Sequence, residues 1–433
     1  MEHLRSFSGW PPSRPARVVV LDWRHETPDW NQETFLAYGR GRSYGDCCLN
    51  ENGILIATRG LDRLISFDAE TGLLCCEAGA TLADILRVSL PRGWFLPVSP
   101  GTQFASVGGA IANDVHGKNH HVRGTFGRWV RRFELLRSDT GRSVCSPQEH
   151  AELFQATIGG LGLTGLILWV ELQLIPVPGA FLDVEALPFH GLDEFLTLSA
   201  SSPAWEYTVA WADFASGRNF GRGIFLRGQH CATPAGAIEP PPSPRFTLAW
   251  VPPFPLIIGP LVRAFNVLWF QKNKAQKHSP VHYSRFFHPL DALGNWNRLY
   301  GPRGFLQYQF VVPQSGGDKA CREVLDCLRR SGLDSFLSVM KVFGAVPSPG
   351  LLSFPLPGIS LCLDFPAKPA VFTLLDKLDT IVLKAGGRVY PAKDARMSPA
   401  SFQAFFPNWS RLENLRDPRF SSSFWRRVTG DRS

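Results

Sequence analysis

The segment from Gly101 to His121 carries the residues best suited to chemistry in this 433-residue chain. It reads GTQFASVGGAIANDVHGKNHH and joins a glycine pair, Gly108 and Gly109, to three histidines and a lysine. Because glycine has no side chain, a polyanionic ligand can approach these backbone N–H groups. A helix starting in Ala110–Asn113 would turn its positive end toward that ligand. A tight turn followed by a solvated basic loop is the plain alternative.

Two more glycine-rich segments are present, and each adjoins a predicted strand. Tyr38–Asp46 (YGRGRSYGD) follows the apolar run Thr34–Ala37, and Thr157–Gly165 (TIGGLGLTG) leads into the apolar, β-branched run Leu166–Ile175. None of the three segments is a GxGxxG fingerprint, so a Rossmann domain is disfavoured. Three converging turns could still bind one extended, phosphate-bearing ligand. Further donors for its phosphates are Arg40, Ser43 and Thr102.

Several longer segments resemble those of one protein family. In the first half they are GRGRSYGD, EAGATLADIL, PVSPGTQFASVGGAIANDVHGKNHH and ELFQATIGGLGLTG. In the second half they are PLDALGNWNRLYGPRGFLQYQFVVP, FLSVMKVFG, LCLDFPAK and GGRVYPAKDAR. Together they resemble the vanillyl-alcohol-oxidase-type flavoproteins. The resemblance spans most of the chain apart from about 179–280, and HGKNHH, FLQYQF and AKDAR in this order make it specific.

The resemblance implies that the three glycine-rich turns hold FAD. Many relatives attach the flavin covalently through a histidine in the first turn, but GRGRSYGD contains none. We therefore expect non-covalent FAD. The residues expected to bind it are Arg40, Gly41, Arg42, Ser43, Tyr44, Gly45, Pro100, Gly101, Thr102, Gly108, Gly109, Ala112, Asn113, His116, Gly117, Thr157, Gly159, Gly160, Gly165, Ile167 and Tyr390.

The resemblance also indicates the catalytic candidates, which are His116, Lys393 and Tyr44. Histidine titrates near neutrality, so His116 could accept or relay a proton, or it could merely hydrogen-bond the flavin. Lys393, in PAKDAR, matches a family lysine beside the flavin. It could hold the substrate hydroxyl, stabilise its alkoxide or counter charge on the reduced flavin, and desolvation can lower a lysine pKa enough for base work. Which of the two residues is the base stays open.

The substrate pocket is expected to draw on a second group of residues. Gln307 and Gln309 alternate in FLQYQF, so a strand would place both amides on one face, with Tyr308 on the other. Paired amides suit sugar hydroxyls, whereas solvent-facing amides are the alternative. The full expected set is Lys118, Tyr300, Gln307, Gln309, Lys341, Cys362 and Lys393. Ser360 departs from the asparagine that we associate with its position in the family.

The resemblance implies a reaction in arabinan and cell-wall precursor synthesis. It is FAD-dependent oxidation of the ribose 2-hydroxyl of a polyprenyl-phosphoryl-β-D-ribose to the 2-keto sugar, the first half of epimerisation. An NAD-dependent short-chain reductase is the expected functional partner. Two alternatives remain: an FAD-dependent oxidase of another sugar or polyol that uses oxygen, and a non-catalytic lipid-phosphate-binding protein on the same fold.

Composition narrows the class of protein. With 44% hydrophobic and 19% charged residues the chain reads as a folded globule, and its length favours two domains. A net charge of +8 without a nucleic-acid motif favours a phosphorylated substrate at an anionic membrane over nucleic acid. Nine cysteines without CxxC indicate reduced thiols and predict no metal site. The N-terminus lacks the apolar core of a signal peptide, so we expect a cytoplasmic protein.

The predicted fold class is α+β with two domains. We expect an FAD-binding domain of two small sheets with helices over 1–178, a substrate-binding domain with a broad antiparallel sheet covered by helices over 179–386, and a return to the FAD-binding domain over 387–433. Helices are predicted at Thr81–Val88, Lys319–Arg330 and Val371–Lys384.

One segment of the predicted substrate-binding domain has an unusual composition. Residues 232–280 form a predicted mobile or membrane-facing insertion, within which Phe246–Gln271 is apolar and aromatic and is followed by the basic KNKAQKH. Its prolines and Arg263 oppose a membrane-spanning helix. It could instead make a peripheral contact with the inner face of the plasma membrane, or it could be an ordinary buried insertion.

Overall fold

The computed structural model describes residues 4–430 except 31, 32, 216, 238, 240–242 and 276. The outermost residues of the predicted first and last segments, 1–3 and 431–433, and part of the predicted insertion therefore lie outside the described residues. Among the described residues the strands form sheets of three, five and eight strands together with two short pairs. The predicted α+β fold with a broad antiparallel sheet is confirmed.

Two small sheets are built from the first 173 residues. A parallel sheet has the order β1-β3-β2, from β1 (Arg17–Val20), β2 (Phe35–Tyr38) and β3 (Ile54–Ala57). An antiparallel sheet has the order β4-β5-β9-β7-β8, from β4 (Leu64–Phe67), β5 (Leu73–Glu77), β7 (Val130–Arg137), β8 (Gly141–Cys145) and β9 (Leu166–Gln173). Two-residue strands β6 (Trp94–Phe95) and β10 (Ile175–Pro176) pair beside them.

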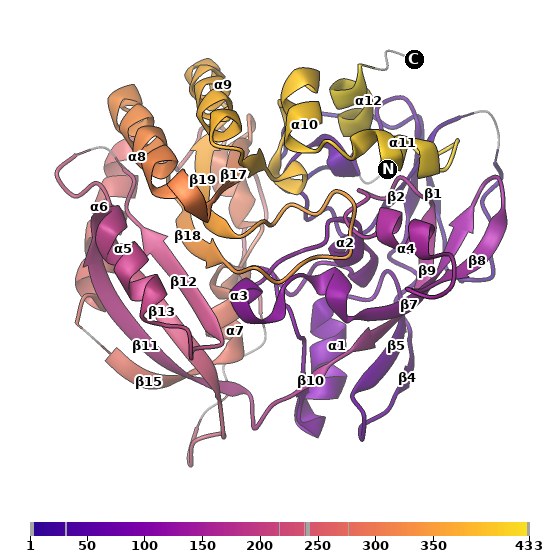
Figure 1. Ribbon diagram of the computed structural model, residues 1–433, viewed down its shortest axis with the longest axis horizontal. Coiled ribbons are helices and arrows are strands. Elements are labelled where there is room, and N and C mark those ends of the chain that lie inside the picture. Colours follow the sequence, from indigo (N-terminus) through magenta and orange to yellow (C-terminus); the bar gives the residue numbers. More distant parts are fainter. Residues whose placement is uncertain are drawn as a thin grey trace.

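The large sheet is antiparallel, with the order β15-β11-β13-β12-β18-β19-β17-β20. Its strands are β11 (Phe181–His190), β12 (Tyr207–Ala212), β13 (Arg222–Cys231), β15 (Lys277–His282), β17 (Phe305–Pro313), β18 (Ser338–Phe343), β19 (Gly358–Pro366) and β20 (Arg388–Val389). A short parallel pair, β14 (Phe246–Thr247) and β16 (Leu293–Gly294), lies outside it. The small sheets and the large sheet form the two halves of the molecule (Figure 1).

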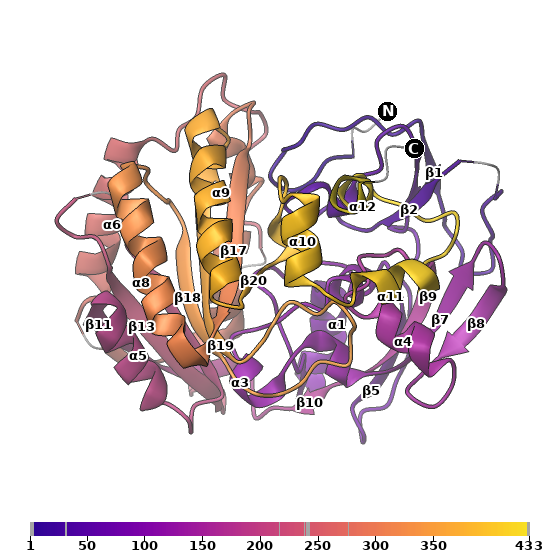
Figure 2. The same ribbon diagram turned by 45° about the horizontal axis from the view of Figure 1, so that its top comes forward.

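Helices cover one face of the large sheet. α8 (Gln314–Ser331) and α9 (Pro369–Lys384) lie side by side over β19, β17 and β20, and α5 (Gly191–Ala200) covers β11 and β13 (Figures 1 and 2). Their apolar residues join those of the sheet in one core. α8 and α9 contain the two helices predicted in this half. The opposite face of the sheet is left to contact the N-terminal half.

The N-terminal half holds short helices. They are α1 (Leu82–Ser89), α2 (Val107–Ala112), α3 (His120–Arg123) and α4 (Ala151–Thr157). α1 confirms the predicted helix: the Thr81 side chain accepts from the Asp84 N–H, and the Asp84 carboxylate accepts from the Thr81 N–H. The expectation that a helix starts at Ala110 is wrong. The Ser106 hydroxyl caps α2 by accepting from Gly109, so Gly108 and Gly109 lie inside its first turn.

The chain ends beside the place where it began. After β20 come α10 (Pro399–Phe405), α11 (Trp409–Leu415) and α12 (Ser423–Thr429), drawn in yellow next to the indigo strands β1 and β2 (Figure 2). Backbone bonds join the two ends: Phe35 N–H donates to Arg419 and Ser423 N–H donates to Leu49. Two more helices, α6 (Gly259–Asn273) and α7 (Tyr283–Phe287), lie between β13 and β17. None of the described helices is long and apolar enough to cross a membrane.

Candidate active site

The three glycine-rich turns meet around α2. A Cβ on Gly39, in the first turn, would lie 2.3 Å from the Ser106 hydroxyl at the start of α2. The N–H of Gly159, in the third turn, donates to the Ile111 carbonyl of α2 at 2.9 Å. Segments 120 residues apart are therefore packed against one helix. This is the convergence that a single extended ligand requires.

The residues around α2 fit the phosphates of FAD. Arg40 Nε and Arg42 Nε are buried and have no hydrogen-bond partner within the described part of the chain. Burial lowers the pKa of Arg42, which shows how costly its charge is without a full partner. A pyrophosphate would supply that partner. In the second glycine-rich segment, a Cβ on Gly101 would meet nothing within 4 Å, so the backbone there faces open space.

Other residues predicted to bind FAD are also required by packing. A Cβ on Gly165 would lie 2.7 Å from the Leu136 carbonyl of β7, at a φ of +137° that favours glycine. Ile167 is buried in the core of the five-stranded sheet. The Thr157 hydroxyl donates to the Leu153 carbonyl at 2.7 Å. Packing alone explains these three residues, so their contact with a flavin stays a prediction.

The large sheet presents polar side chains to the N-terminal half from three adjacent strands. Gln307 pairs with Asp364 and Gln309 with Cys362 across β17 and β19, and Lys341 of β18 pairs with Ser360. Cross-strand partners share a face, and alternate residues of one strand do too. All six side chains therefore lie on the face away from α8 and α9. Tyr308 points the other way and donates to Asp379 of α9 at 2.9 Å, as the alternation predicts.

His116 lies where the two halves meet. Its ring is buried against Phe343, Phe354 and Tyr390. The amide nitrogen of Gln309 lies 2.9 Å from Nε2 and donates to it, so the ring proton sits on Nδ1, which has no hydrogen-bond partner among the described residues. Burial lowers the pKa of His116 well below its usual value, and the nearby cations Lys341 and Lys393 add to this. The imidazole is therefore neutral, with one N–H available.

Lys393 reaches the same place from the other end of the chain. It ends a short 3-10 turn, Pro391–Lys393, and its ammonium lies 3.6 Å from the centre of the Tyr44 ring. The two segments are joined directly, because the Tyr44 N–H donates to the Ala392 carbonyl at 2.9 Å. Burial lowers the pKa of Lys393, whereas Cys362 and Asp364 oppose that shift. Burial likewise raises the pKa of Tyr44, which keeps its hydroxyl protonated.

Asp364 is a site residue that the sequence analysis missed. Its side chain is fully buried, and one oxygen accepts from the Gln307 amide at 2.5 Å while the other has no partner among the described residues. Burial raises its pKa to about 7, and Gln307 and Lys393 act in the opposite direction. A signal was present in ISLCLDFP, because Ser360, Cys362 and Asp364 are polar at every second position of an apolar strand.

Two lysines flank this cluster. Lys341 donates to the Gly117 carbonyl at 3.3 Å, and burial lowers its pKa to about 8. Lys118 donates to the Phe286 carbonyl and lies 4.5 Å from the Phe286 ring, and burial lowers its pKa to about 7. The charge of Lys341 also lowers the pKa of Lys118, so the two ammonium groups repel each other and an anion between them would relieve that repulsion.

Tyr300 and Cys362 complete the predicted substrate set. Tyr300 is buried and stacks on Phe305 at 4.2 Å, and its hydroxyl has no partner in the described structure. It belongs to the apolar cluster that includes Tyr44. Cys362 lies on the polar face, and burial raises its pKa to about 12, so it stays a thiol. Gln307, Gln309, Lys341 and Cys362 share one face of the large sheet, and Tyr300 belongs to a neighbouring apolar cluster. Substrate contact by the predicted set stays a prediction.

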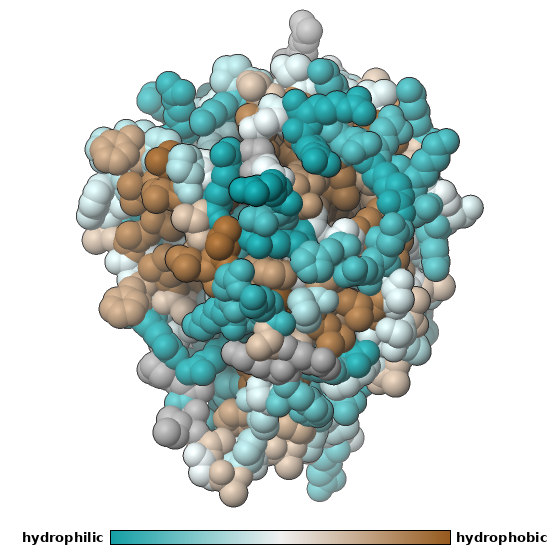
Figure 3. Space-filling model, turned by 90° about the vertical axis from the view of Figure 1, so that its left-hand side faces the viewer, coloured by the Kyte–Doolittle hydropathy of each residue, from teal (hydrophilic) through white to brown (hydrophobic). Residues whose placement is uncertain are grey.

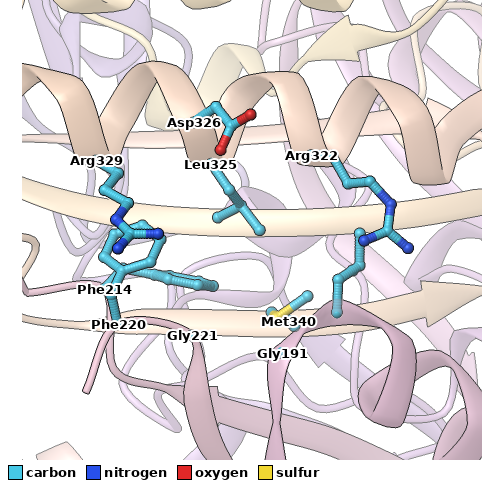
Figure 4. Close-up of a pocket in the computed structure, with 10 residues that line it drawn as sticks. Gly191, Phe214, Phe220, Gly221, Arg322, Leu325, Asp326, Arg329 and Met340 are labelled. Atoms are coloured by element: carbon cyan, nitrogen blue, oxygen red, sulfur yellow. The ribbon is translucent and has the colours of Figure 1, made fainter. Parts of the chain in front are cut away.

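A cavity elsewhere in the molecule is separate from this chemistry. It has a volume of about 250 Å³ and lies under α8, with Leu325 and Met340 inside and Arg322, Asp326 and Arg329 on the helix at its edge (Figure 4). Phe214 and Phe220 lie at one end of it (Figure 4). None of the predicted catalytic or binding residues lines it. We do not assign it to the active site.

Known proteins are similar to this chain in sequence. A family described as "FAD binding domain" matches residues 27–146. The decaprenylphosphoryl-beta-D-ribose oxidase of Mycolicibacterium smegmatis is 37% identical over 91% of this chain and 88% of that protein. An uncharacterized protein of Streptomyces coelicolor is 34% identical over 80% of this chain and 99% of that protein. A D-lactate dehydrogenase of Anaerostipes hadrus is 24% identical over 33% of this chain and 31% of that protein.

The FAD-binding family matches residues 27–146, and the similarity to an oxidase continues through the large sheet. These findings define an FAD-dependent oxidoreductase. The prediction of FAD as the cofactor is confirmed. More narrowly, the chain belongs to the decaprenylphosphoryl-β-D-ribose oxidase family, because the identity extends over most of both proteins.

Proposed function

We propose that this protein oxidises the 2-hydroxyl of a polyprenyl-phosphoryl-β-D-ribose to the 2-keto sugar. The observation that carries the proposal is one buried face of the large sheet, where paired amides and a carboxyl adjoin two lysines. Amides and a carboxyl suit sugar hydroxyls, and lysines suit a phosphate. FAD, when bound, accepts the hydride and thereby supplies the redox chemistry.

The chain's own groups have separate tasks in this proposal. Lys393, whose pKa is lowered, holds the reacting hydroxyl and receives or shares its proton. Neutral His116 offers its Nδ1 proton as a hydrogen-bond donor, because the surrounding cations oppose a positive charge on the ring. Gln307, Gln309 and Asp364 orient the sugar so that one C–H points toward the flavin. Lys118 and Lys341 bind the phosphate.

The expected partner follows from the product. A 2-keto sugar must be reduced from the opposite face to complete epimerisation to the arabinose form, and an NAD-dependent short-chain reductase provides that class of reaction. We retain this reductase as a functional partner in the supply of arabinan precursors for the cell wall. Coupled turnover of the two purified proteins, with NADH consumed only when both are present, would support the assignment.

Anaerobic mixing with candidate substrates tests the reaction itself. Polyprenyl-phosphoryl ribose should bleach the flavin absorbance, whereas the arabinose epimer, with its 2-hydroxyl inverted, should not. Rapid bleaching by a free alditol but not by the lipid-linked ribose would instead indicate an oxidase of another sugar or polyol. Colourless protein that still binds lipid phosphate through its lysines would indicate a non-catalytic binding protein.

A lipid-linked substrate also accounts for an apolar surface. Large hydrophobic side chains are exposed along 246–269, with Phe246 76%, Trp250 63% and Leu268 70% exposed. Figure 3 shows apolar side chains gathered on the face of the molecule that carries α6. The same helix buries Val262, Asn266 and Phe270 on its other side, so it is anchored and yet apolar outward. The alternative of an ordinary buried insertion explains the buried side of α6 but not its exposed apolar side.

The apolar surface leads toward the candidate site. Ile257, between Trp250 and α6, packs in the cluster of Trp296, Tyr300 and Phe305 that Tyr44 also joins. The Leu256 N–H donates to the Leu299 carbonyl at 2.7 Å. One side of this segment thus faces solvent, while Ile257 on its other side packs against the cluster that also contacts Tyr44. We propose a peripheral contact of this surface with the cytoplasmic face of the membrane, aided by the exposed Lys272 and Lys274.

Flotation with vesicles tests the membrane contact. The double variant Trp250→Glu, Leu268→Glu should lose most binding to phosphatidylglycerol vesicles, because two charges would enter the interface. Leu383→Glu is a matched control, since Leu383 is 40% exposed on α9, away from this surface. Equal flotation of all three proteins would end the membrane proposal and leave the oxidase proposal intact.

A further inference from the structure

We infer that Arg427, in the C-terminal helix α12, is a positioning residue that sets the place of Lys393 over Tyr44. Neither residue of that pair is close to Arg427 in the sequence. The inference rests on the proposed role of Lys393. It goes beyond that role because it assigns a positioning function to Arg427 in the C-terminal helix.

Arg427 joins the two turns that carry Tyr44 and Lys393. Its guanidinium makes a two-pronged contact with Asp46, with Nε at 2.9 Å and Nη2 at 2.7 Å from the two carboxylate oxygens. Nη2 also donates to Asp394 at 2.9 Å. Asp46 is two residues after Tyr44, and Asp394 directly follows Lys393. One planar cation therefore bridges both turns.

The carboxylates of Asp46 and Asp394 are buried and hydrogen-bonded. Asp46 and Asp394 are only 3% and 4% exposed. Asp394 also accepts from the N–H groups of Arg396 and Met397, which fixes the turn after Lys393. Burial raises the pKa of Asp46, and Arg427 opposes that shift. Without the arginine, two buried carboxylates would face each other across the two turns.

The backbones between these carboxylates are in direct contact. A Cβ on Gly45 would lie 1.5 Å from the Asp394 carbonyl oxygen, so only glycine permits the approach. Together with the bond from Tyr44 N–H to the Ala392 carbonyl, this contact holds the two turns together, and the Lys393 ammonium lies over the Tyr44 ring. Repulsion between Asp46 and Asp394 would open this contact and displace the ammonium.

The neighbouring Arg426 provides a matched control. It lies on the same helix, but its guanidinium donates to the Asn50 side chain and to the Glu51 carbonyl, and it makes no hydrogen bond to Asp46 or Asp394 among the described residues. Arg426→Gln therefore tests the docking of α12 alone. Arg427→Gln tests docking and the bridge together, and Arg427→Lys keeps the charge but not the two-pronged contact.

The experiment is a double-mutant cycle on the FAD-loaded protein, with stopped-flow flavin reduction by polyprenyl-phosphoryl ribose. Arg427→Gln should slow reduction about tenfold or more with little change in substrate Kd, since a shift of about 1 Å in a catalytic group is costly. Arg427→Lys should recover part of the rate. In a Lys393→Ala background, Arg427→Gln should add little further loss, because the residue through which it acts is gone.

Two readouts do not depend on turnover. The visible circular dichroism of the bound flavin should change in Arg427→Gln and not in Arg426→Gln, and thermal unfolding reports the stability of each variant. Equal effects of the two glutamine variants, or fully additive losses with Lys393→Ala, would overturn the inference. If Arg427→Gln does not fold, Arg427→Lys in the same cycle decides the question. If the wild type itself is not reduced by the substrate, the proposed function fails instead.

Discussion

At the scale of single residues, the site depends on burying charge without fully pairing it. Asp364 has a carboxylate oxygen without a partner among the described residues, and the ammonium groups of Lys341 and Lys393 have lowered pKa values because they are buried. With pKa values of about 7 and about 8, Asp364 and Lys341 change protonation close to neutral pH. They also leave hydrogen-bonding capacity for a sugar and a phosphate.

Asp364→Asn should reduce kcat/KM about tenfold, since it removes an acceptor while an amide oxygen can still accept from Gln307. It should also change the stability profile. The folded-state pKa of about 7 lies above the ordinary carboxyl value, so this group makes folding less favourable as pH rises from about 4 to 7. Chemical denaturation across that range should show a shallower decline for Asp364→Asn. Asp326→Asn, on the surface of α8, should match the wild type in both measurements.

The lowered pKa of Lys341 leads to a prediction about the pH dependence of kcat/KM. Its pKa of about 8 in the folded protein means that its positive charge is present below pH 8 and is lost above it. kcat/KM for a phosphate-bearing substrate should therefore fall as pH rises through about 8. Lys341→Arg keeps its charge over this range and should remove that inflection. An unchanged profile in Lys341→Arg would show that another group titrates there.

At the scale of elements, close backbone contacts hold the site together. The first turn and the Lys393 turn meet at Gly45, whereas Gly101 faces open space. Gly45→Ala should destabilise the protein by about 1–3 kcal/mol or prevent folding, because the added methyl overlaps a backbone carbonyl. Gly101→Ala should leave the melting temperature near that of the wild type. Calorimetry of the two variants tests the packing, and equal melting temperatures would contradict it.

The same scale shows what sequence reasoning could predict. The alternation of Gln307, Tyr308 and Gln309 predicted correctly which side chains share a face, because strand geometry has a period of two. Thr81 and Asp84 likewise marked the start of α1. The pairing of Gln307 with Asp364 could not be predicted, because register between distant strands depends on tertiary packing. The bridge from Arg427 to Asp46 spans nearly the whole chain and leaves no local signal.

At the scale of the whole molecule, the site is assembled between two halves that share one continuous chain. The large sheet runs from Phe181 to Val389, and the last helices return to the first strands. The domain division at 178/179 and 386/387 remains a proposal. Because the predicted FAD contacts come from turns far apart in sequence, cofactor binding should stabilise the whole fold.

Added FAD should therefore raise the melting temperature of cofactor-stripped protein. At a concentration of 100 times Kd, binding stabilises the folded state by about 2.7 kcal/mol.

Non-covalent attachment of the flavin leads to a separate prediction. Acid precipitation should release the flavin into the supernatant, since the first turn holds no histidine to bond it. Flavin that stays with the precipitated protein would contradict this.

The most direct measurement uses polyprenyl-phosphoryl ribose carrying deuterium at C2, mixed anaerobically with the FAD-loaded protein in a stopped-flow instrument. If the sheet face orients the C2–H bond toward the flavin, reduction should show a primary isotope effect with the C2 label and none with a C3 label. An effect from C3 alone, or no flavin reduction at all, would contradict the account.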